Sequence, residues 1–344
     1  MKKMFLSLVA AIVAATATYA QSSLVATLNH ENQISVFNGQ YALSAALAAA
    51  EHGDIITLSS GTFVAADITK AVTLRGAGNA DDNITGQTVT RVSGNFYLNI
   101  PNDVEQRLSI EGIIFTGTMY KKDPEHKYAT FTKCQFATID YAGTGPAVGW
   151  RFIDCYISSM IRLYEGTTAT FLNCRVCEPC AYTSDSKPSS YEFDHCIVVS
   201  RNSAGFGNYP LRNSKFYNCF IFEIEPYFSN LTYRGLQATN EAYNCVGYDA
   251  AEVSVFRYIN QNSNTDLTTD EYNALFKEDT FYELTDEAKA KYKDADGGEV
   301  GLYGGVMPYS MSIQTPQITK LNVAQKTTTD GKLNVSIEVT ATDE

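Results

Sequence analysis

The stretch Phe152-Ile-Asp-Cys155-Tyr-Ile157 decides the fold, because close copies of it return about every twenty residues along the chain. The next copy is Phe171-Leu-Asn-Cys174-Arg-Val176. Others are Phe131-Thr-Lys-Cys134-Gln-Phe136, Phe193-Asp-His-Cys196-Ile-Val198, Phe216-Tyr-Asn-Cys219-Phe-Ile221 and the weaker Ala242-Tyr-Asn-Cys245-Val-Gly247. Self-similarity at a fixed short period is the signature of a solenoid, in which each coil stacks on its neighbours. The repeat therefore predicts an all-β solenoid.

Phenylalanine and cysteine lie three residues apart in these copies, so a straight strand would point them to opposite faces. A corner between them lets both face inward. The residue before cysteine is mostly Asn, Asp or His, types that tolerate a left-handed backbone, so we place the corner there. This favours a turn role over a catalytic one for Asp154 and His195. The predicted inward ladder comprises Phe131, Cys134, Phe152, Cys155, Phe171, Cys174, Phe193, Cys196, Phe216, Cys219 and Cys245.

The pattern resembles the right-handed parallel β-helix of pectate-lyase-like proteins. Residues 42–53 form an amphipathic pattern that ends at a glycine, and the resemblance implies that this helix caps the N-terminal end of the solenoid. A cap is needed because an open end exposes the core and unpaired backbone. The run Val300–Pro308 resembles the closing segment of secreted β-helix proteins of Bacteroidota-type bacteria.

The chain divides into three parts. Residues 1–20 have a basic start, an apolar stretch and small residues before the expected cleavage point after Ala20, as in a secretory signal peptide. Residues 21–310 form the β-helix, with a lead-in at 21–40 and the cap helix at 41–52. Residues 311–344 form a β tail, because Ile318–Val323 and Leu333–Thr340 alternate as two strands of a hairpin. We expect an exported protein (periplasmic, on the outer surface or extracellular) that does not span a membrane.

The charge of the chain limits its partners. The 344 residues carry 26 basic and 38 acidic side chains, a net charge of −12. Removing Lys2 and Lys3 with the signal peptide leaves 24 − 38 = −14. Such a chain lacks the basic footprint that nucleic acid requires. The negative charge also disfavours direct binding of a polyanionic polysaccharide, unless a divalent cation bridges the two sets of charges.

Eight cysteines in an exported chain usually suggest disulfides. The six ladder cysteines would lie about 4.8 Å apart on neighbouring strands, whereas a disulfide needs Cβ atoms about 3.8 Å apart. We therefore expect a column of free thiols. Cys177 and Cys180 allow a local disulfide, two unlinked loop thiols or, less favoured, a metal site, since the ligands that complete a zinc site are missing.

No motif assigns catalytic residues or a cofactor. The resemblance implies that a lyase would use Ca²⁺ with an Arg or Lys base, and that a hydrolase would use clustered aspartates. The candidates Asp140, Asp154, Asp185 and Asp194 are widely separated in sequence. Asp294, Asp296 and Glu299 offer oxygen ligands for Ca²⁺, but a solvated turn is the favoured interpretation.

Aromatic residues suggest a binding surface. Tyr156, Tyr217, Phe220 and Tyr243 flank the corner at outward positions, and stacking of coils would bring Tyr217 beside Tyr243. Such rings can stack on sugars, so our first hypothesis is glycan binding along one face without catalysis. The second is a polysaccharide lyase or glycoside hydrolase whose site has no recognisable motif. The third is an adhesin that binds protein. The sequence leaves the glycan and the oligomeric state open.

Overall fold

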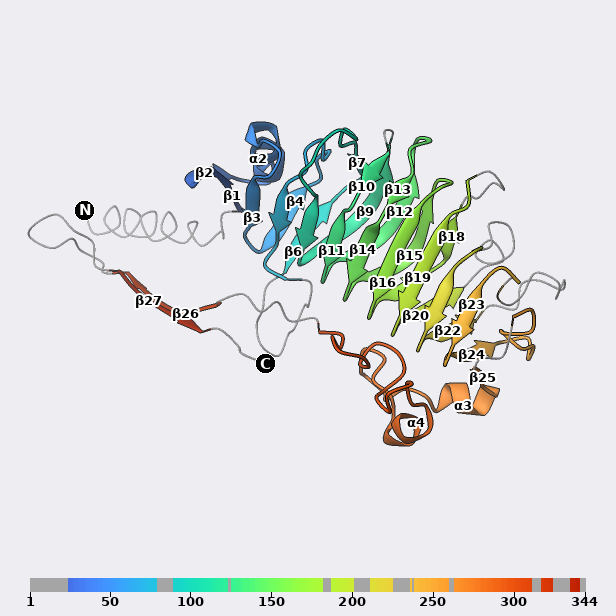
Figure 1. Ribbon diagram of the computed structural model, residues 1–344. Coiled ribbons are helices and arrows are strands. Elements are labelled where there is room, and N and C mark those ends of the chain that lie inside the picture. The colour runs from blue at the N-terminus through green and yellow to red at the C-terminus, as the bar shows by residue number, and fades with distance from the viewer. Residues whose placement is uncertain are drawn as a thin grey trace, which may run out of the picture.

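The computed structural model describes residues 24–78, 89–122, 125–181, 187–200, 211–224, 236, 238–259, 263–310, 317–323 and 335–340. The chain forms an all-β parallel solenoid of about eight turns, as the repeat predicts. Two long sheets run side by side along the solenoid (Figure 1). The predicted signal peptide lies outside the described residues.

The first sheet has eleven strands. Its order is β2 (Gln33–Asn38), β1 (Val25–His30), β3 (Ile55–Leu58), β5 (Thr73–Arg75), β8 (Ser109–Glu111), β11 (Thr130–Thr132), β14 (Trp150–Ile153), β16 (Thr168–Leu172), β19 (Ser190–Asp194), β21 (Lys215–Tyr217) and β23 (Glu241–Tyr243). From β3 onward the neighbours are parallel. The strands of this sheet precede the corner of each coil.

The second sheet has twelve strands, which follow the corner. Its main path is β25 (Thr265–Asp266), β24 (Val246–Asp249), β22 (Phe220–Glu223), β20 (Ile197–Ser200), β17 (Arg175–Cys177), β15 (Tyr156–Leu163), β12 (Gln135–Tyr141), β9 (Ile113–Lys121), β6 (Thr90–Ser93) and β4 (Gly61–Val64). β7 (Phe96–Leu98) also pairs with β9, and β18 (Pro179–Ala181) with β15. The short strands β10 (His126–Lys127) and β13 (Ala147–Val148) form a separate parallel pair.

The predicted ladder fills the core between the sheets. Phe131, Phe152, Phe171, Phe193 and Phe216 are in register and fully buried. Neighbouring rings stack with centroids 4.7–4.9 Å apart. Every residue at the predicted corner has a left-handed backbone, with φ between 49° and 55° at Lys133, Asp154, Asn173, His195, Asn218 and Asn244. The sequence pattern therefore predicts both the stacking and the turn correctly.

The ladder cysteines form the expected column of buried free thiols. The backbone N–H of Cys155 donates to Sγ of Cys174 at 3.3 Å, and Cys174 donates in the same way to Cys196 at 3.4 Å. Cys219 and Cys245 accept from the preceding coil in the same way, so four of the ladder sulfurs each satisfy a backbone donor at a corner. Cys177 and Cys180 are also free and buried, so the alternative of a disulfide between them is wrong.

The N-terminal end is closed by a helix, as predicted, and by a hairpin that no sequence pattern predicted. Helix α2 (Ala42–Ala49) lies within the predicted span and buries Leu43 and Leu47. The expected lead-in is instead the antiparallel pair β1–β2. Its tight turn places Glu31 and Asn32 at φ 48° and 67°.

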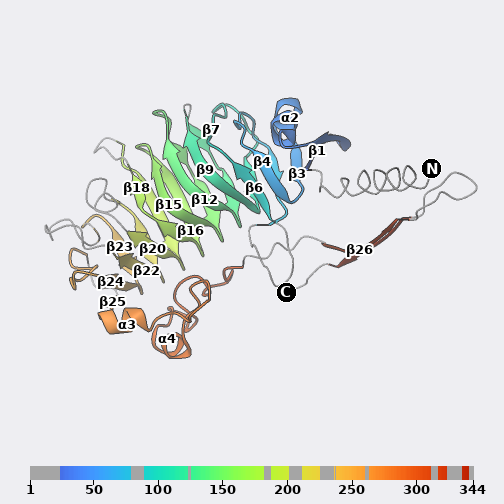
Figure 2. The same ribbon diagram turned by 180° about the vertical axis from the view of Figure 1, so that it is seen from behind.

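The C-terminal part of the domain lies beside the last coils of the solenoid (Figure 2) and packs on the outer side of the second sheet there. α3 (Thr269–Asn273) and α4 (Asp286–Lys291) are capped by Thr268 and Thr285, whose side chains accept from the backbone N–H groups of Glu271 and Ala288. With the turns up to residue 310, they form a second hydrophobic core against β20, β22 and β24. Beyond it, β26 (Gln317–Val323) and β27 (Val335–Thr340) pair antiparallel, as expected for the tail. None of the helices in the described ranges is long and apolar enough to cross a bilayer.

A strap, residues 293–304, also runs along the corner column. Asn173 Nδ2 donates to the carbonyls of Leu302 and Gly304 at 2.8 and 2.9 Å. Asn218 O accepts from Gly301 N at 2.9 Å. Asn244 Nδ2 donates to Lys293 O at 2.8 Å. The corner residues of successive coils are therefore joined by one continuous piece of chain.

Candidate functional site

The outer side of the first sheet carries rows of side chains in register, which we call the first-sheet face. Alternate residues of these strands point away from the core. The row beside the corner is Glu111, Thr132, Ile153, Leu172, Asp194, Tyr217 and Tyr243. The next row is Ser109, Thr130, Arg151, Thr170, Glu192, Lys215 and Glu241. Apolar, hydroxyl and charged groups of both signs thus alternate along a regular surface.

Tyr217 and Tyr243 lie together at one end of this face, as their register predicts. Their ring centroids are 5.4 Å apart, and the rings are tilted by only 10° from parallel. Tyr243 is 37% exposed. Its hydroxyl donates to Glu241 Oε2 at 2.9 Å, which raises the pKa of Tyr243. Lys215 Nζ lies 3.8 Å from the same carboxylate oxygen. The pair presents a fixed aromatic platform beside charged hydrogen-bonding groups.

A second aromatic platform, at Tyr128, was not expected from the sequence. Tyr128 is 49% exposed and has a left-handed backbone, with φ 59°. A Cβ at Gly149 would lie 2.9 Å from its ring, so only glycine leaves room for the ring on the next coil. The guanidinium of Arg107 lies over the ring at 4.9 Å from the centroid. Tyr128 and Gly149 lie outside the Phe-to-Cys copies, so the repeat does not mark this platform.

Tyr156 and Phe220 do not join this face. Both follow the corner and therefore belong to the second sheet. Phe220 is 1% exposed, because Phe276 and Tyr292 pack on it. Tyr156 lies against Phe281 at 5.5 Å. The sequence predicted that both side chains point outward, but it did not predict the C-terminal part that covers them. Phe220 is therefore out of reach of an external polymer.

One acid and one base do converge on the second sheet. Arg162 Nε and Nη2 donate to the two oxygens of Asp140 at 2.9 and 2.8 Å. This hydrogen bonding raises the pKa of Arg162. The register of β12 and β15 places them side by side, a match that depends on a bulge and was not visible in the sequence. The bidentate pair occupies both groups, which leaves neither available as a free base.

His195 lies between two carboxylates beneath the strap. Its Nδ1 is 2.8 Å from Asp194 Oδ1, and its Nε2 is 3.3 Å from Asp294 Oδ2. Burial lowers the pKa of His195, but its hydrogen bonds and charge interactions with Asp194 and Asp294 outweigh burial and raise it. Gly304 and Gly305 lie directly on the imidazole. The cluster therefore fastens the strap and has no room for a substrate beside the ring.

The candidate calcium ligands Asp294, Asp296 and Glu299 lie in a turn, the interpretation that the sequence favours. Asp294 Oδ1 accepts from the backbone N–H groups of Asp296 and Gly298 at 2.9 and 2.7 Å. Glu299 pairs with Lys289 at 3.0 Å. Across the described ranges, no three His, Cys, Asp or Glu side chains are grouped closely enough to hold a metal ion.

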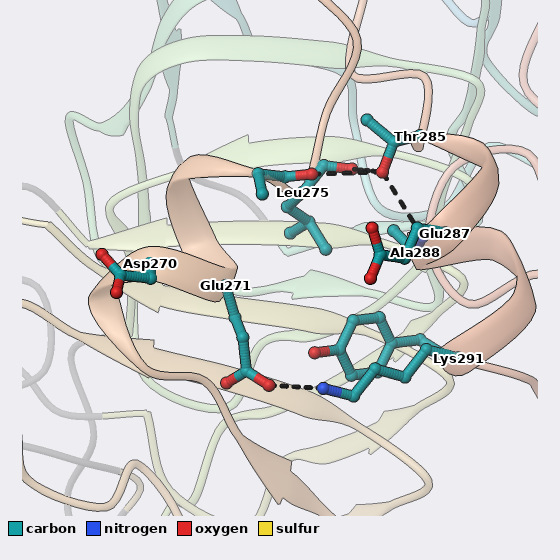
Figure 3. A pocket seen from close by; sticks show the side chains of 9 residues that line it. Asp270, Glu271, Leu275, Thr285, Glu287, Ala288 and Lys291 are labelled. Atoms are coloured by element: carbon teal, nitrogen blue, oxygen red, sulfur yellow. Dashed lines mark hydrogen bonds and ion pairs between the residues drawn. The ribbon is translucent and has the colours of Figure 1, made fainter.

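A shallow cavity of about 230 Å³ lies between α3 and α4 (Figure 3). The ion pair of Lys291 with Glu271 crosses it and, with bonds from Thr268, lowers the pKa of Glu271 to about 2. Thr285 bonds the carbonyls of Ala274 and Leu275 and caps α4. These contacts tie the two helices together.

Comparison of the chain with protein-family models, with curated proteins and with solved structures finds no match.

Proposed function

We propose that this is an exported, pectate-lyase-like β-helix protein that binds extracellular glycans along the first-sheet face without catalysis. The stacked pair Tyr217 and Tyr243 carries the proposal. Tyrosine presents a flat apolar ring with a polar edge, which suits the faces of sugar rings and their hydroxyl groups. The backbone register fixes the pair before any ligand arrives, so binding costs little ordering of side chains.

The charges of the face favour a neutral glycan. Arg151, Glu192, Lys215 and Glu241 alternate in sign along their row, so no stretch of the row is uniformly basic. The net charge of −12 repels a polyanion at long range. Planar carboxylates and guanidinium groups can each bind neighbouring hydroxyls of an uncharged sugar.

The runner-up is a polysaccharide lyase or glycoside hydrolase, and the pair Asp140–Arg162 is the observation in its favour. A catalytic acid or base must be able to gain or lose a proton near the working pH. The pKa of Arg162 is shifted upward, away from that range. The upward shift of the Arg162 pKa therefore argues against a catalytic role for the pair Asp140–Arg162.

Affinity electrophoresis and calorimetry with neutral and uronate polysaccharides test the proposal. We expect a neutral glycan to bind, and the double variant Tyr217→Ala/Tyr243→Ala to weaken binding at least about tenfold, or about 1.4 kcal/mol. The matched control is Tyr97→Ala, because Tyr97 and Tyr120 stack at 5.4 Å on the other sheet. Loss of binding in both variants alike would contradict the assignment to this face.

The same incubations distinguish the other hypotheses. Unsaturated products or new reducing ends would establish turnover and replace the binding proposal with the enzymatic one. Absence of binding to every glycan would refute glycan recognition and favour the protein-binding adhesin.

A further inference from the structure

A cavity of about 260 Å³ opens between residues 100–107 and 126–128, at the edge of the first-sheet face. Its floor is apolar, with the buried Ile100 and the partly buried Val104. Its walls carry Glu105, Arg107 and Tyr128. Such a volume lies below the roughly 300–1,000 Å³ of pockets for drug-sized ligands, so it suits a single ring.

His126 lines this cavity and is only 3% exposed. Trp150 holds the residue in place, because Trp150 Nε1 donates to its carbonyl at 3.2 Å and the two rings meet edge to face at 5.8 Å. Nδ1 of His126 is buried without a hydrogen-bond partner. Leaving a buried polar atom unpaired is unfavourable, so this nitrogen is a feature that a bound ligand or an ordered water would explain.

The imidazole is neutral at ordinary pH. Burial, followed by the charge of Lys121, lowers the pKa of His126 to about 4. A neutral imidazole has one nitrogen that donates and one that accepts a hydrogen bond. A hydroxyl group matches either nitrogen, whereas a carboxylate matches only the donor.

The cavity walls favour the same kind of ligand. Glu105 and Arg107 supply an acceptor and a donor of opposite charge. Lys127, which also lines the cavity, pairs with Glu125 at 3.0 Å, so the charged groups suit neither a strong anion nor a strong cation. Tyr128 supplies an aromatic surface that is half exposed and fixed against Gly149. An aromatic platform next to planar polar groups fits a ring with hydroxyls around its edge.

Position connects the cavity with the glycan-binding face. Arg107 and Tyr128 lie two residues before Ser109 and Thr130, which start β8 and β11 of the first sheet. They therefore continue the outward positions of the same face toward its edge. We propose that this cavity is a subsite for one neutral sugar residue, the end or a side branch of the glycan on the first-sheet face. The link to a polymer rests on the proposed function, whereas recognition of a single sugar does not.

The test uses the full chain and a panel of simple methyl glycosides: glucoside, galactoside, mannoside and xyloside. Saturation-transfer NMR and titration should detect binding of at least one of them. Arg107→Ala and Tyr128→Ala, which change exposed walls, should weaken that binding at least tenfold, while Tyr97→Ala, in the stacked pair on the other sheet, leaves it unchanged. The ¹⁵N signal of His126 Nδ1 should move on titration in the wild type, and its reassignment through His126→Gln identifies it among the four histidines.

The outcomes separate the two proposals. Glycoside binding that depends on Arg107 and Tyr128, together with no polymer binding, would support the subsite and refute the extended face. Polymer binding that depends on Tyr217 and Tyr243, with no glycoside bound, would refute the subsite alone. Glycoside binding that survives both wall substitutions, or that leaves His126 unmoved, would also refute it.

Discussion

Replacing Asp154 by asparagine should make the protein more resistant to unfolding at alkaline pH. Asp154 occupies the corner column at a left-handed position, where other coils have Asn173, Asn218 and Asn244. It is 4% exposed, and its Oδ1 is buried without a hydrogen-bond partner. Burial outweighs the nearby charge of Lys133 and raises the pKa of Asp154 to about 7. Asparagine keeps the shape and the backbone preference but cannot ionise.

The size of the effect follows from linkage. The folded state keeps a proton that the unfolded chain, with a pKa near 3.8, has already lost. The resulting stability is therefore full below pH 4 and disappears as the pH rises through 7. Each unit of pKa shift corresponds to about 1.4 kcal/mol. Between pH 5 and pH 8 the wild type should lose about 3 kcal/mol of unfolding free energy through this group.

Urea denaturation of both proteins at pH 5, 6, 7 and 8 measures the difference directly. Groups that titrate in both proteins cancel, so the advantage of Asp154→Asn should grow by about 3 kcal/mol up to pH 7 and then level off. Glu192→Gln, which removes an exposed carboxylate from the first-sheet face, is the control and should show no such growth. A constant difference between wild type and Asp154→Asn would refute the account of a carboxyl group whose pKa is raised by burial.

Two other predictions concern the thiols and the C-terminal helices. Under denaturing conditions all eight cysteines should react with a thiol reagent, and the native protein should react far more slowly because each is buried; fewer than six thiols would refute the free column. Thr268→Ala removes the side-chain acceptor that receives the backbone N–H of Glu271 in the capping box of α3 and should cost about 1 kcal/mol of stability by urea denaturation. Thr269→Ala, one residue later on the same helix, is the matched control, and equal losses would contradict the capping role.

The sequence predicts the features that recur in every coil, namely the ladder and the corner. It predicts little of how the coils contact the segments before and after the repeat. The corner could be placed because Asn, Asp and His recur at one position where only a left-handed backbone resolves the conflict between Phe and Cys. The stack Tyr217–Tyr243 followed from the same register. The hairpin β1–β2 was missed because it lies before the first repeat and is antiparallel, so no copy of the pattern marks it.

The cover over Phe220 was missed for a different reason. The side chains that cover it, such as Phe276 and Tyr292, are scattered through short helices and turns with no period of their own. Their packing on the second sheet depends on tertiary contacts. Likewise, the pair Asp140–Arg162 depends on an extra residue in β15 that shifts its register against β12, and the cavity at His126 depends on the path of residues 100–107. Local sequence patterns do not show which of these residues come together in space.

The strap changes how this molecule should come apart. An ordinary stack of coils can lose its last rung without disturbing the others, since each touches only its neighbours. Here one piece of chain binds the turns of several rungs at Asn173, Asn218 and Asn244. Before the final coil can unfold, the strap must therefore release the coils further inside the solenoid. The C-terminal half should therefore open as a single block, with hydrogen exchange at those rungs proceeding together.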